Sequence, residues 1–240
     1  MKKHIPNMLT LVNLLAGILS IYIGMLGDLK VAAYLIFIAA ILDFMDGFAA
    51  RMLNAYSDIG KQLDSLADLV SFGVAPGFIL LNMISISHGQ PGTTGTSGTI
   101  LPFIAFMIPL FAALRLAKFN IDENQENSFL GLPTPAVAIL VASLPLIKSY
   151  LYQDRGLFYM IITNTYFLTG IAVITSLLMV IPLPMFAFKF KSYGWAENKV
   201  KYSFLLLSLV LIIWLQFVAI PLIIALYLLL SLVFYLADIQ

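Results

Sequence analysis

Long apolar stretches alternate with short polar ones along this 240-residue chain. At 1.5 Å per helical residue, each stretch is long enough to approach or cross a hydrocarbon core about 30 Å thick. The expected spans are Met8–Leu26, Val31–Leu53, Leu63–Ile84, Ile100–Ala117, Pro133–Leu151, Leu157–Ile181, Tyr202–Phe217 and Ile220–Leu236. The last two would form a single helix of about 52 Å if unbroken, which is too long for one crossing. Pro221 is the expected break, so the pattern predicts an all-α, polytopic membrane helix bundle of about eight spans.

Composition supports a membrane protein. Hydrophobic residues make up 61% of the chain and charged residues 10%, whereas soluble domains average roughly 25% charged residues. The net charge of +1 carries no information about nucleic acid, and no dense basic run suggests a nucleic-acid partner. The chain has no cysteine, which excludes disulfides and thiolate metal sites.

The distribution of Lys and Arg predicts the orientation in the membrane. Eight spans place both termini on the same side, and the first span is expected to be retained rather than removed as a signal peptide. With that side cytoplasmic, ten cations lie inside: Lys2, Lys3, Arg51, Lys61, Arg115, Lys118, Lys189, Lys191, Lys199 and Lys201. Three lie outside: Lys30, Lys148 and Arg155. The positive-inside rule therefore favours a cytoplasmic N-terminus, in an inner (cytoplasmic) membrane.

Four aspartates stand within 26 residues of a mostly apolar sequence. Asp43 and Asp46 are three residues apart, and Asp64 and Asp68 are four apart, so each pair occupies one face of a helix. A polar turn is expected over Met52–Ile59. If the two helices are antiparallel, the two acidic pairs face each other at one level.

Four unpaired carboxylates at full membrane depth would cost roughly 10–14 kcal/mol. Only two cations, Arg51 and Lys61, lie nearby in the sequence to neutralise these four negative charges. One or two divalent ions would neutralise the remainder, and converging oxygen ligands suit Mg²⁺ or Mn²⁺. A pair of such ions can clamp a phosphate during its displacement. Gly47 and Ala50 leave the acidic face open to a ligand that approaches the backbone.

A polar hairpin that lines a transporter or channel is the alternative for this segment. Transporters often contain paired half-repeats. The sequence has no second acidic hairpin, which argues against a cation transporter.

The acidic segment resembles the signature of the CDP-alcohol phosphatidyltransferase family. It has the pattern D-x2-D-G-x2-A-R-x8-G-x3-D-x3-D, formed by Asp43, Asp46, Gly47, Ala50, Arg51, Gly60, Asp64 and Asp68. The resemblance implies a six-helix core with two additional C-terminal spans, and the domains 1–182 (family core), 183–201 (cytoplasmic basic linker) and 202–240 (transmembrane hairpin). It also implies a CDP-diacylglycerol donor, two metal ions held by the four aspartates, Asp68 as general base, and a homodimer.

The same resemblance implies a set of donor contacts. The segment that begins at Pro6 resembles the P-N-x-x-T stretch of the family, and Asn7, Thr10 and Asn13 lie in it and just after it at helical spacing. These three residues are expected near the cytidine diphosphate; helix capping at the membrane interface is the alternative. Gly47 and Ala50 would let the cytidine lie against the helix. The remaining expected donor contacts are Arg51, Ser57 and Gly60.

Three further strings, SFGVAP, LRLAKFN and F-x-GLP-x-PA, resemble the branch of the family that uses L-serine as acceptor. Arg115 or Lys118 is the expected cation for the serine carboxylate; anchoring at the inner membrane surface is the alternative. Glycerol phosphate and inositol phosphate remain alternative acceptors. A phosphorylated acceptor would need more cations than the few that this region offers, which favours serine.

Overall fold

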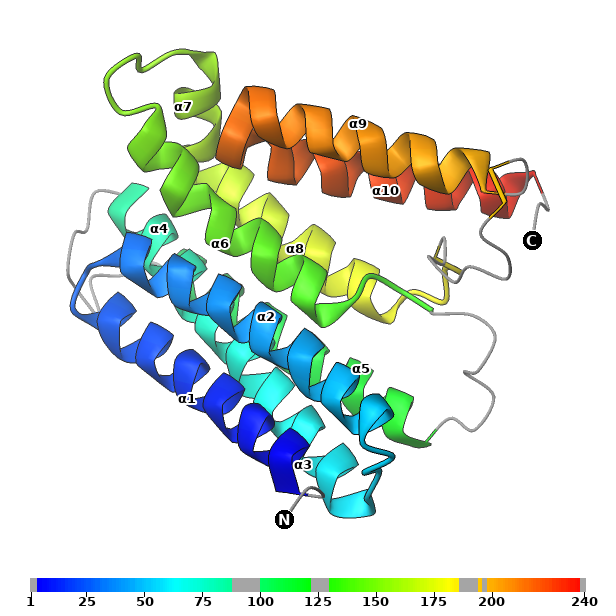
Figure 1. The fold of residues 1–240 in the computed structure, drawn as a ribbon. Coiled ribbons are helices and arrows are strands. Elements are labelled where there is room, and N and C mark those ends of the chain that lie inside the picture. The colour runs from blue at the N-terminus through cyan, green and yellow to red at the C-terminus, as the bar shows by residue number, and fades with distance from the viewer. Residues whose placement is uncertain (1–3, 88–99, 122–129, 186–193, 196–197, 238–240) are drawn as a thin grey trace.

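A computed structural model describes residues 4–87, 100–121, 130–185, 194–195 and 198–237, and these residues are almost entirely helical (Figure 1). The π-helical and 3₁₀ segments are labelled η. In chain order the elements are α1 (Ile5–Met25), α2 (Leu29–Met52), α3 (Asp58–Asp68), η2 (Leu69–Val74), α4 (Ala75–Ser87), η3 (Leu101–Phe106), α5 (Met107–Ile121), α6 (Thr134–Tyr150), α7 (Leu157–Ile162), α8 (Thr165–Val180), α9 (Lys199–Leu215), η4 (Gln216–Val218) and α10 (Ala219–Leu236).

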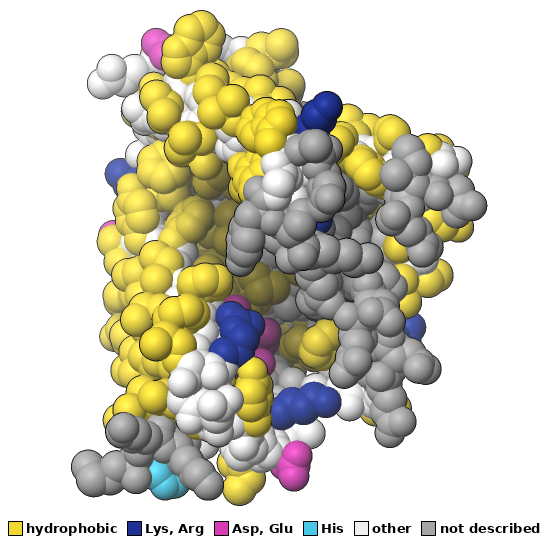
Figure 2. All heavy atoms as spheres, turned by 45° about the vertical axis from the view of Figure 1, so that its right-hand side comes forward, with side chains coloured by type: hydrophobic (Ala, Val, Ile, Leu, Met, Phe, Trp, Pro, Cys, Tyr) yellow, Lys and Arg dark blue, Asp and Glu magenta, His cyan; other side chains and the backbone are white. Residues whose placement is uncertain are grey.

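The helices confirm the predicted all-α membrane bundle. Five helical stretches are long and apolar enough to cross a membrane: α1, α2, α3 to α4, η3 to α5, and α9 to α10. Two shorter apolar helices, α6 and α8, lie among them. Apolar side chains cover the left-hand and upper parts of the face shown in Figure 2, as expected of a surface that contacts lipid, whereas charged side chains gather in its lower middle.

The α9 to α10 stretch is a hairpin of two helices rather than one long helix (Figure 1). The chain reverses at η4, where Gln216 has a φ of 48°. The predicted break at Pro221 was therefore wrong in position. Pro221 lies in the first turn of α10, where a missing N–H leaves no helical hydrogen bond unmade.

The third span runs without interruption from Asp58 to Ser87, but its middle, η2, is a π-helix. The π-helical segment ends at Val74, two residues before Pro76, whose missing N–H would disturb a regular helix there. The hydroxyl of Ser71 in η2 donates to the carbonyl of Asn13 on α1 over 3.0 Å. A Cβ built on Gly17 would lie 2.5 Å from Ser71 Oγ, so only glycine allows α1 to approach η2 this closely.

The predicted span Leu157–Ile181 is divided into two helices, which corrects the prediction. The side chain of Asn164 accepts hydrogen bonds from the N–H groups of Tyr166 and Phe167, at 2.9 and 3.1 Å, and so starts α8. The apolar pattern runs through this break because α7 and α8 are both apolar.

The chain enters α6 through Gly131 and two prolines, Pro133 and Pro135. Gly131 has a φ of 73°, and its N–H donates to the carbonyl of Leu183 at 2.9 Å. The N–H of Leu132 donates to the carbonyl of Leu178, also at 2.9 Å. These bonds join the start of α6 to the end of α8.

Most of the predicted linker 183–201, with Lys189 and Lys191, falls outside the described residues.

Candidate active site

The polar turn between α2 and α3 brings the two acidic pairs together. α2 ends at Met52, and Ser57 starts α3 by accepting a hydrogen bond from the N–H of Gly60 at 3.0 Å. Because the helices then run in opposite directions, one carboxylate oxygen from each of Asp43, Asp64 and Asp68 lies within 4.8 Å of the other two. The predicted meeting of the two acidic pairs is confirmed for these three residues.

The fourth aspartate has a different partner. Asp46 is 6% exposed, and its carboxylate accepts a hydrogen bond of 2.7 Å from the hydroxyl of Thr10 on α1. It still lies within electrostatic range of the other three aspartates. Thr10 is therefore placed beside the acidic cluster rather than at a helix cap.

The three clustered carboxylates suit a hard divalent cation. Oxygen ligands converge from two helices, and Oδ1 of Asp68 is buried with no hydrogen-bond partner among the described residues. A buried carboxylate oxygen without a partner is costly unless a cation or donor meets it. These residues therefore fit Mg²⁺ or Mn²⁺.

The other predicted donor contacts occupy different environments. Arg51 and Ser57 are exposed, whereas Gly47 and Ala50 are partly exposed on the same helix as Asp43. A Cβ built on Gly47 would meet no atom within 4 Å, so this face of α2 is open.

Gly60 and Asn13, two of the predicted donor contacts, lie in closely packed surroundings. A Cβ on Gly60 would lie 3.0 Å from Ser57 Oγ and 3.1 Å from Asn7 Oδ1, which places Asn7 at the α1–α3 contact. Asn13 is fully buried, and both polar atoms of its side chain lack hydrogen-bond partners among the described residues. The donor roles of these residues stay predictions.

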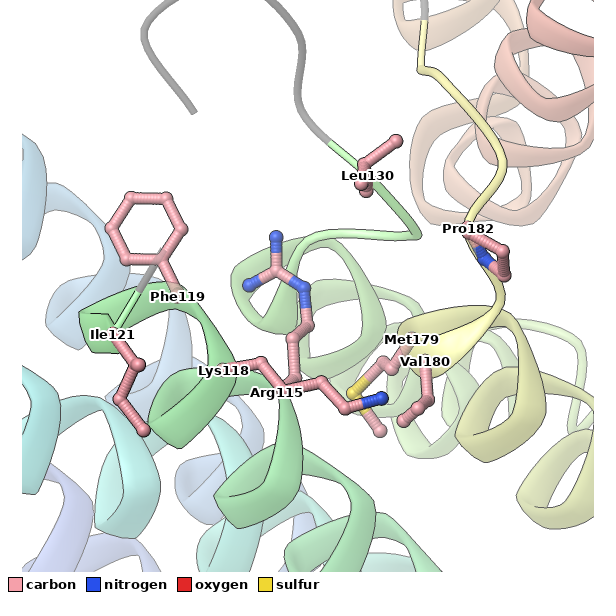
Figure 3. Close-up of a pocket in the computed structure, with 8 residues that line it drawn as sticks. All are labelled: Arg115, Lys118, Phe119, Ile121, Leu130, Met179, Val180 and Pro182. Atoms are coloured by element: carbon pink, nitrogen blue, oxygen red, sulfur yellow. The ribbon is translucent and has the colours of Figure 1, made fainter. Parts of the chain in front are cut away.

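A pocket of about 330 Å³ lies beside the predicted acceptor cations (Figure 3). Arg115 and Lys118 rise from α5 on one side of it, and the opposite side comes from the end of α8 and the chain after it. The full lining is Arg115, Lys118, Phe119, Ile121, Leu130, Met179, Val180 and Pro182. Arg115 also interacts electrostatically with Asp68, so the pocket adjoins the acidic cluster.

The chain matches the model of the CDP-alcohol phosphatidyltransferase family over residues 3–178. The chain belongs to this family. The match includes the acidic cluster and both pocket-lining cations, and it ends before the α9–α10 hairpin.

Several curated relatives share the sequence of this region. The CDP-diacylglycerol–serine O-phosphatidyltransferase of Bacillus subtilis is 37% identical over 146 residues, which cover 59% of this chain and 75% of that protein. The protein of the same name from Helicobacter pylori is 34% identical over 153 residues, covering 63% and 61%. The archaetidylserine synthase of Methanothermobacter thermautotrophicus is 32% identical over 148 residues, covering 61% and 59%. The chain thus spans about three fifths of the length of the last two.

Some residues of this site were not singled out from the sequence. The side-chain amide of Asn120 on α5 donates to Ser65 Oγ on α3 at 2.9 Å, and Lys61 Nζ donates to the carbonyl of Asn120 at 3.4 Å. These bonds tie the pocket helix to the acidic helix. Asn120 stands in the LRLAKFN string, but a single sequence gives no sign of its partner. Met179 and Pro182 reach the pocket only through the packing of α8, which the sequence does not reveal.

Proposed function

We propose that the chain transfers the phosphatidyl group of CDP-diacylglycerol to the hydroxyl of L-serine, which yields phosphatidylserine and CMP. The observation that carries this proposal is the carboxylate cluster of Asp43, Asp64 and Asp68 next to a pocket that contains a guanidinium. The names of the serine-using relatives support the choice of acceptor.

In this reaction the serine oxygen forms a bond to the phosphorus of the phosphatidyl group, and the bond from that phosphorus to the CMP oxygen breaks. CMP leaves with the electron pair. Asp68 takes the proton of the attacking hydroxyl, because its buried carboxylate lies in the cluster and within electrostatic range of the pocket cation Arg115. Removal of this proton makes the oxygen a stronger nucleophile.

Asp43, Asp64 and Asp68 would hold a divalent cation, and the carboxylate of Asp46 adds negative charge within electrostatic range of the cluster. A bound ion supplies positive charge that offsets the charge of the diphosphate and of the departing CMP. Thr10 holds the carboxylate of Asp46 in place through its hydrogen bond. The open face at Gly47 receives the cytidine, and Arg51 and Ser57 stand nearby for phosphate or ribose.

The acceptor is recognised by its charge. Serine carries a carboxylate, and the partly buried Arg115 offers a guanidinium that can bind it through two parallel hydrogen bonds. Lys118 is exposed at the edge of the same pocket. Two cations suffice for one carboxylate, whereas glycerol phosphate or inositol phosphate brings about two negative charges at neutral pH.

We place this end of the bundle at the cytoplasmic face of an inner membrane. Among the described residues, Arg51, Lys61, Arg115 and Lys118 lie at the acidic end, and Lys30, Lys148 and Arg155 lie in or beside the connections at the other. This bias supports the orientation. A homodimer stays a prediction.

An acceptor panel tests the proposal. The purified full chain receives CDP-diacylglycerol, Mg²⁺ or Mn²⁺, and in separate reactions labelled L-serine, glycerol phosphate or inositol phosphate. Label in phosphatidylserine with stoichiometric release of CMP is expected. Incorporation of glycerol phosphate but not serine would refute the choice of acceptor, and ion flux without CMP release would refute the enzymatic function.

A further inference from the structure

A second cavity, of about 260 Å³, lies at the end of the bundle opposite the acidic cluster. Its lining comes from the ends of α4 and α6, from α7 and from the start of α8, which meet at the upper left of Figure 1. Ser87 of this lining follows Asp68 along one continuous helical span, about 28 Å further on at 1.5 Å per residue. The cavity therefore belongs to the opposite membrane surface, which is the outer one in the orientation given above.

The lining of this cavity combines apolar and polar side chains. Met83, Ile162 and Leu168 are buried apolar residues. The polar side chains are Ser87, Lys148, Tyr159 and Thr163. A cavity in which the two kinds lie side by side suits an amphiphile, because the headgroup and the chain of such a ligand need different surroundings.

The donors that remain free in the cavity indicate the charge of its ligand. The hydroxyl of Thr163 donates to the carbonyl of Tyr159 at 2.7 Å, and the hydroxyls of Ser87 and Thr165 bond to each other at 2.9 Å. Among the described residues, the ammonium of Lys148 and the phenol of Tyr159 have no hydrogen-bond or ion-pair partner. Lys148 brings three N–H donors and no acceptor, and the phenol adds an O–H. An anion with several oxygens would satisfy these donors together.

Aromatic contacts hold a second cation close to the cavity. The guanidinium of Arg155 lies over the ring of Tyr152, 5.3 Å from its centre. Tyr152 in turn packs edge-on against Tyr159, with ring centres 6.3 Å apart. Asp154 is exposed and does not line the cavity. Because tyrosine rings are enriched at the boundary between lipid and water, Lys148 and Arg155 place positive charge at the depth of the lipid headgroups.

We propose that this cavity binds the headgroup phosphate of an anionic phospholipid from the outer leaflet. Lys148 and the phenol of Tyr159 bind the phosphate oxygens, and the apolar part of the lining receives the start of an acyl chain. Basic pockets between membrane helices are known sites for anionic headgroups. Simple snorkelling of Lys148 to the membrane surface would need neither a cavity nor a second donor beside it. This inference does not depend on the acceptor that the chain uses.

Lipid binding to the purified full chain tests the proposal. Labelled phosphatidylglycerol is titrated onto the wild-type chain and onto Lys148→Gln in a neutral detergent. The variant should bind about tenfold more weakly, as expected when a hydrogen-bonded charge is lost, and the lipid should raise its unfolding midpoint less than that of the wild type. Lys30→Gln is the matched control, because Lys30 is exposed at the same end of the bundle and does not line the cavity.

Two competing ligands distinguish the source of the phosphate. Inorganic phosphate tests for a site that needs no acyl chain, and phosphatidylcholine tests for one that needs no net negative charge. Neither should displace labelled phosphatidylglycerol at equal concentration. Displacement by inorganic phosphate would make this a site for a free anion, and equal displacement by phosphatidylcholine would remove the role of charge; either result overturns the proposal.

Tyr159→Phe covers the case in which Lys148→Gln does not fold. This variant keeps the ring that packs against Tyr152 and removes one donor to the phosphate, so the affinity for phosphatidylglycerol should fall at least about threefold. Wild-type affinity in a folded Lys148→Gln, or in Tyr159→Phe, would overturn the inference.

Discussion

The hydroxyl of Thr10 on α1 donates a 2.7 Å hydrogen bond to the carboxylate of Asp46 on α2. Both residues are buried, so the bond is shielded from water. Hydrogen bonds to an ionised acceptor contribute about 1.5–3 kcal/mol. The bond joins the first span to the acidic region and fixes Asp46, the aspartate outside the group of three carboxylates.

We expect Thr10→Val to lower kcat/KM about tenfold and to raise the Mg²⁺ concentration needed for half-maximal rate, because the carboxylate of Asp46 loses its hydrogen bond from the Thr10 hydroxyl. Thr10→Ser keeps the hydroxyl and serves as the control. Measured rates of CMP release over a Mg²⁺ titration give both values. Wild-type behaviour of the valine variant would show that the bond has no part in the reaction.

The acidic cluster was predictable because helical spacing fixes which residues share a face. Asp43 is separated from Asp64 and Asp68 by one short polar turn, so local geometry brought the three together. The turn at Gly131 also has a local cause, since glycine readily adopts its φ of 73° and the prolines after it restrict the backbone.

The features that the sequence did not reveal depend on contacts between distant segments. Asn164 divides an apolar stretch with a cap that hydropathy cannot detect. The hairpin reverses at Gln216 rather than Pro221, because proline is tolerated in a first helical turn.

Asp68→Asn should lower turnover at least about a hundredfold, because a carboxamide cannot accept the proton of the attacking hydroxyl. The side chain keeps its size, so the fold and donor binding should be retained. The measurement pairs single-turnover rates with CDP-diacylglycerol affinity. Asp58→Asn is the matched control, since Asp58 begins α3 and is exposed outside the cluster. Turnover at the wild-type rate in Asp68→Asn would eliminate Asp68 as the base.

Removal of divalent ions should abolish CMP release, because Asp43, Asp64 and Asp68 would then repel both one another and the donor diphosphate. Chelation with EDTA followed by addition of Mg²⁺ or Mn²⁺ should restore the rate. EDTA that is saturated with Mg²⁺ before its addition provides the control. An undiminished rate in excess EDTA would contradict the assignment of the cluster as a metal site.

Gly17→Ala should destabilise the bundle by about 1–3 kcal/mol, the usual effect of an added methyl group in a close-packed interior. The new Cβ would lie 2.5 Å from Ser71 Oγ and 2.8 Å from Ser71 Cα. Because Cα belongs to the backbone, relief of this clash would require the backbone to shift. Gly24→Ala, also on α1, is the control, because its Cβ would meet only Ala32 Cβ at 3.6 Å. Thermal unfolding midpoints in one detergent compare the two; equal midpoints would argue against the close contact of α1 with η2.

Gly47→Leu should abolish donor binding while the protein stays folded. A Cβ at Gly47 meets nothing within 4 Å, so the fold has room for a side chain there. Leucine would fill the open face of α2 next to Asp46, where we place the cytidine, and would exclude the nucleotide by its volume. Gly170→Leu on α8 is the matched control, since its Cβ is equally free. The measurement is the affinity for CDP-diacylglycerol together with the unfolding midpoint of each variant. Unchanged affinity in Gly47→Leu would contradict the placement of the cytidine on this face of α2.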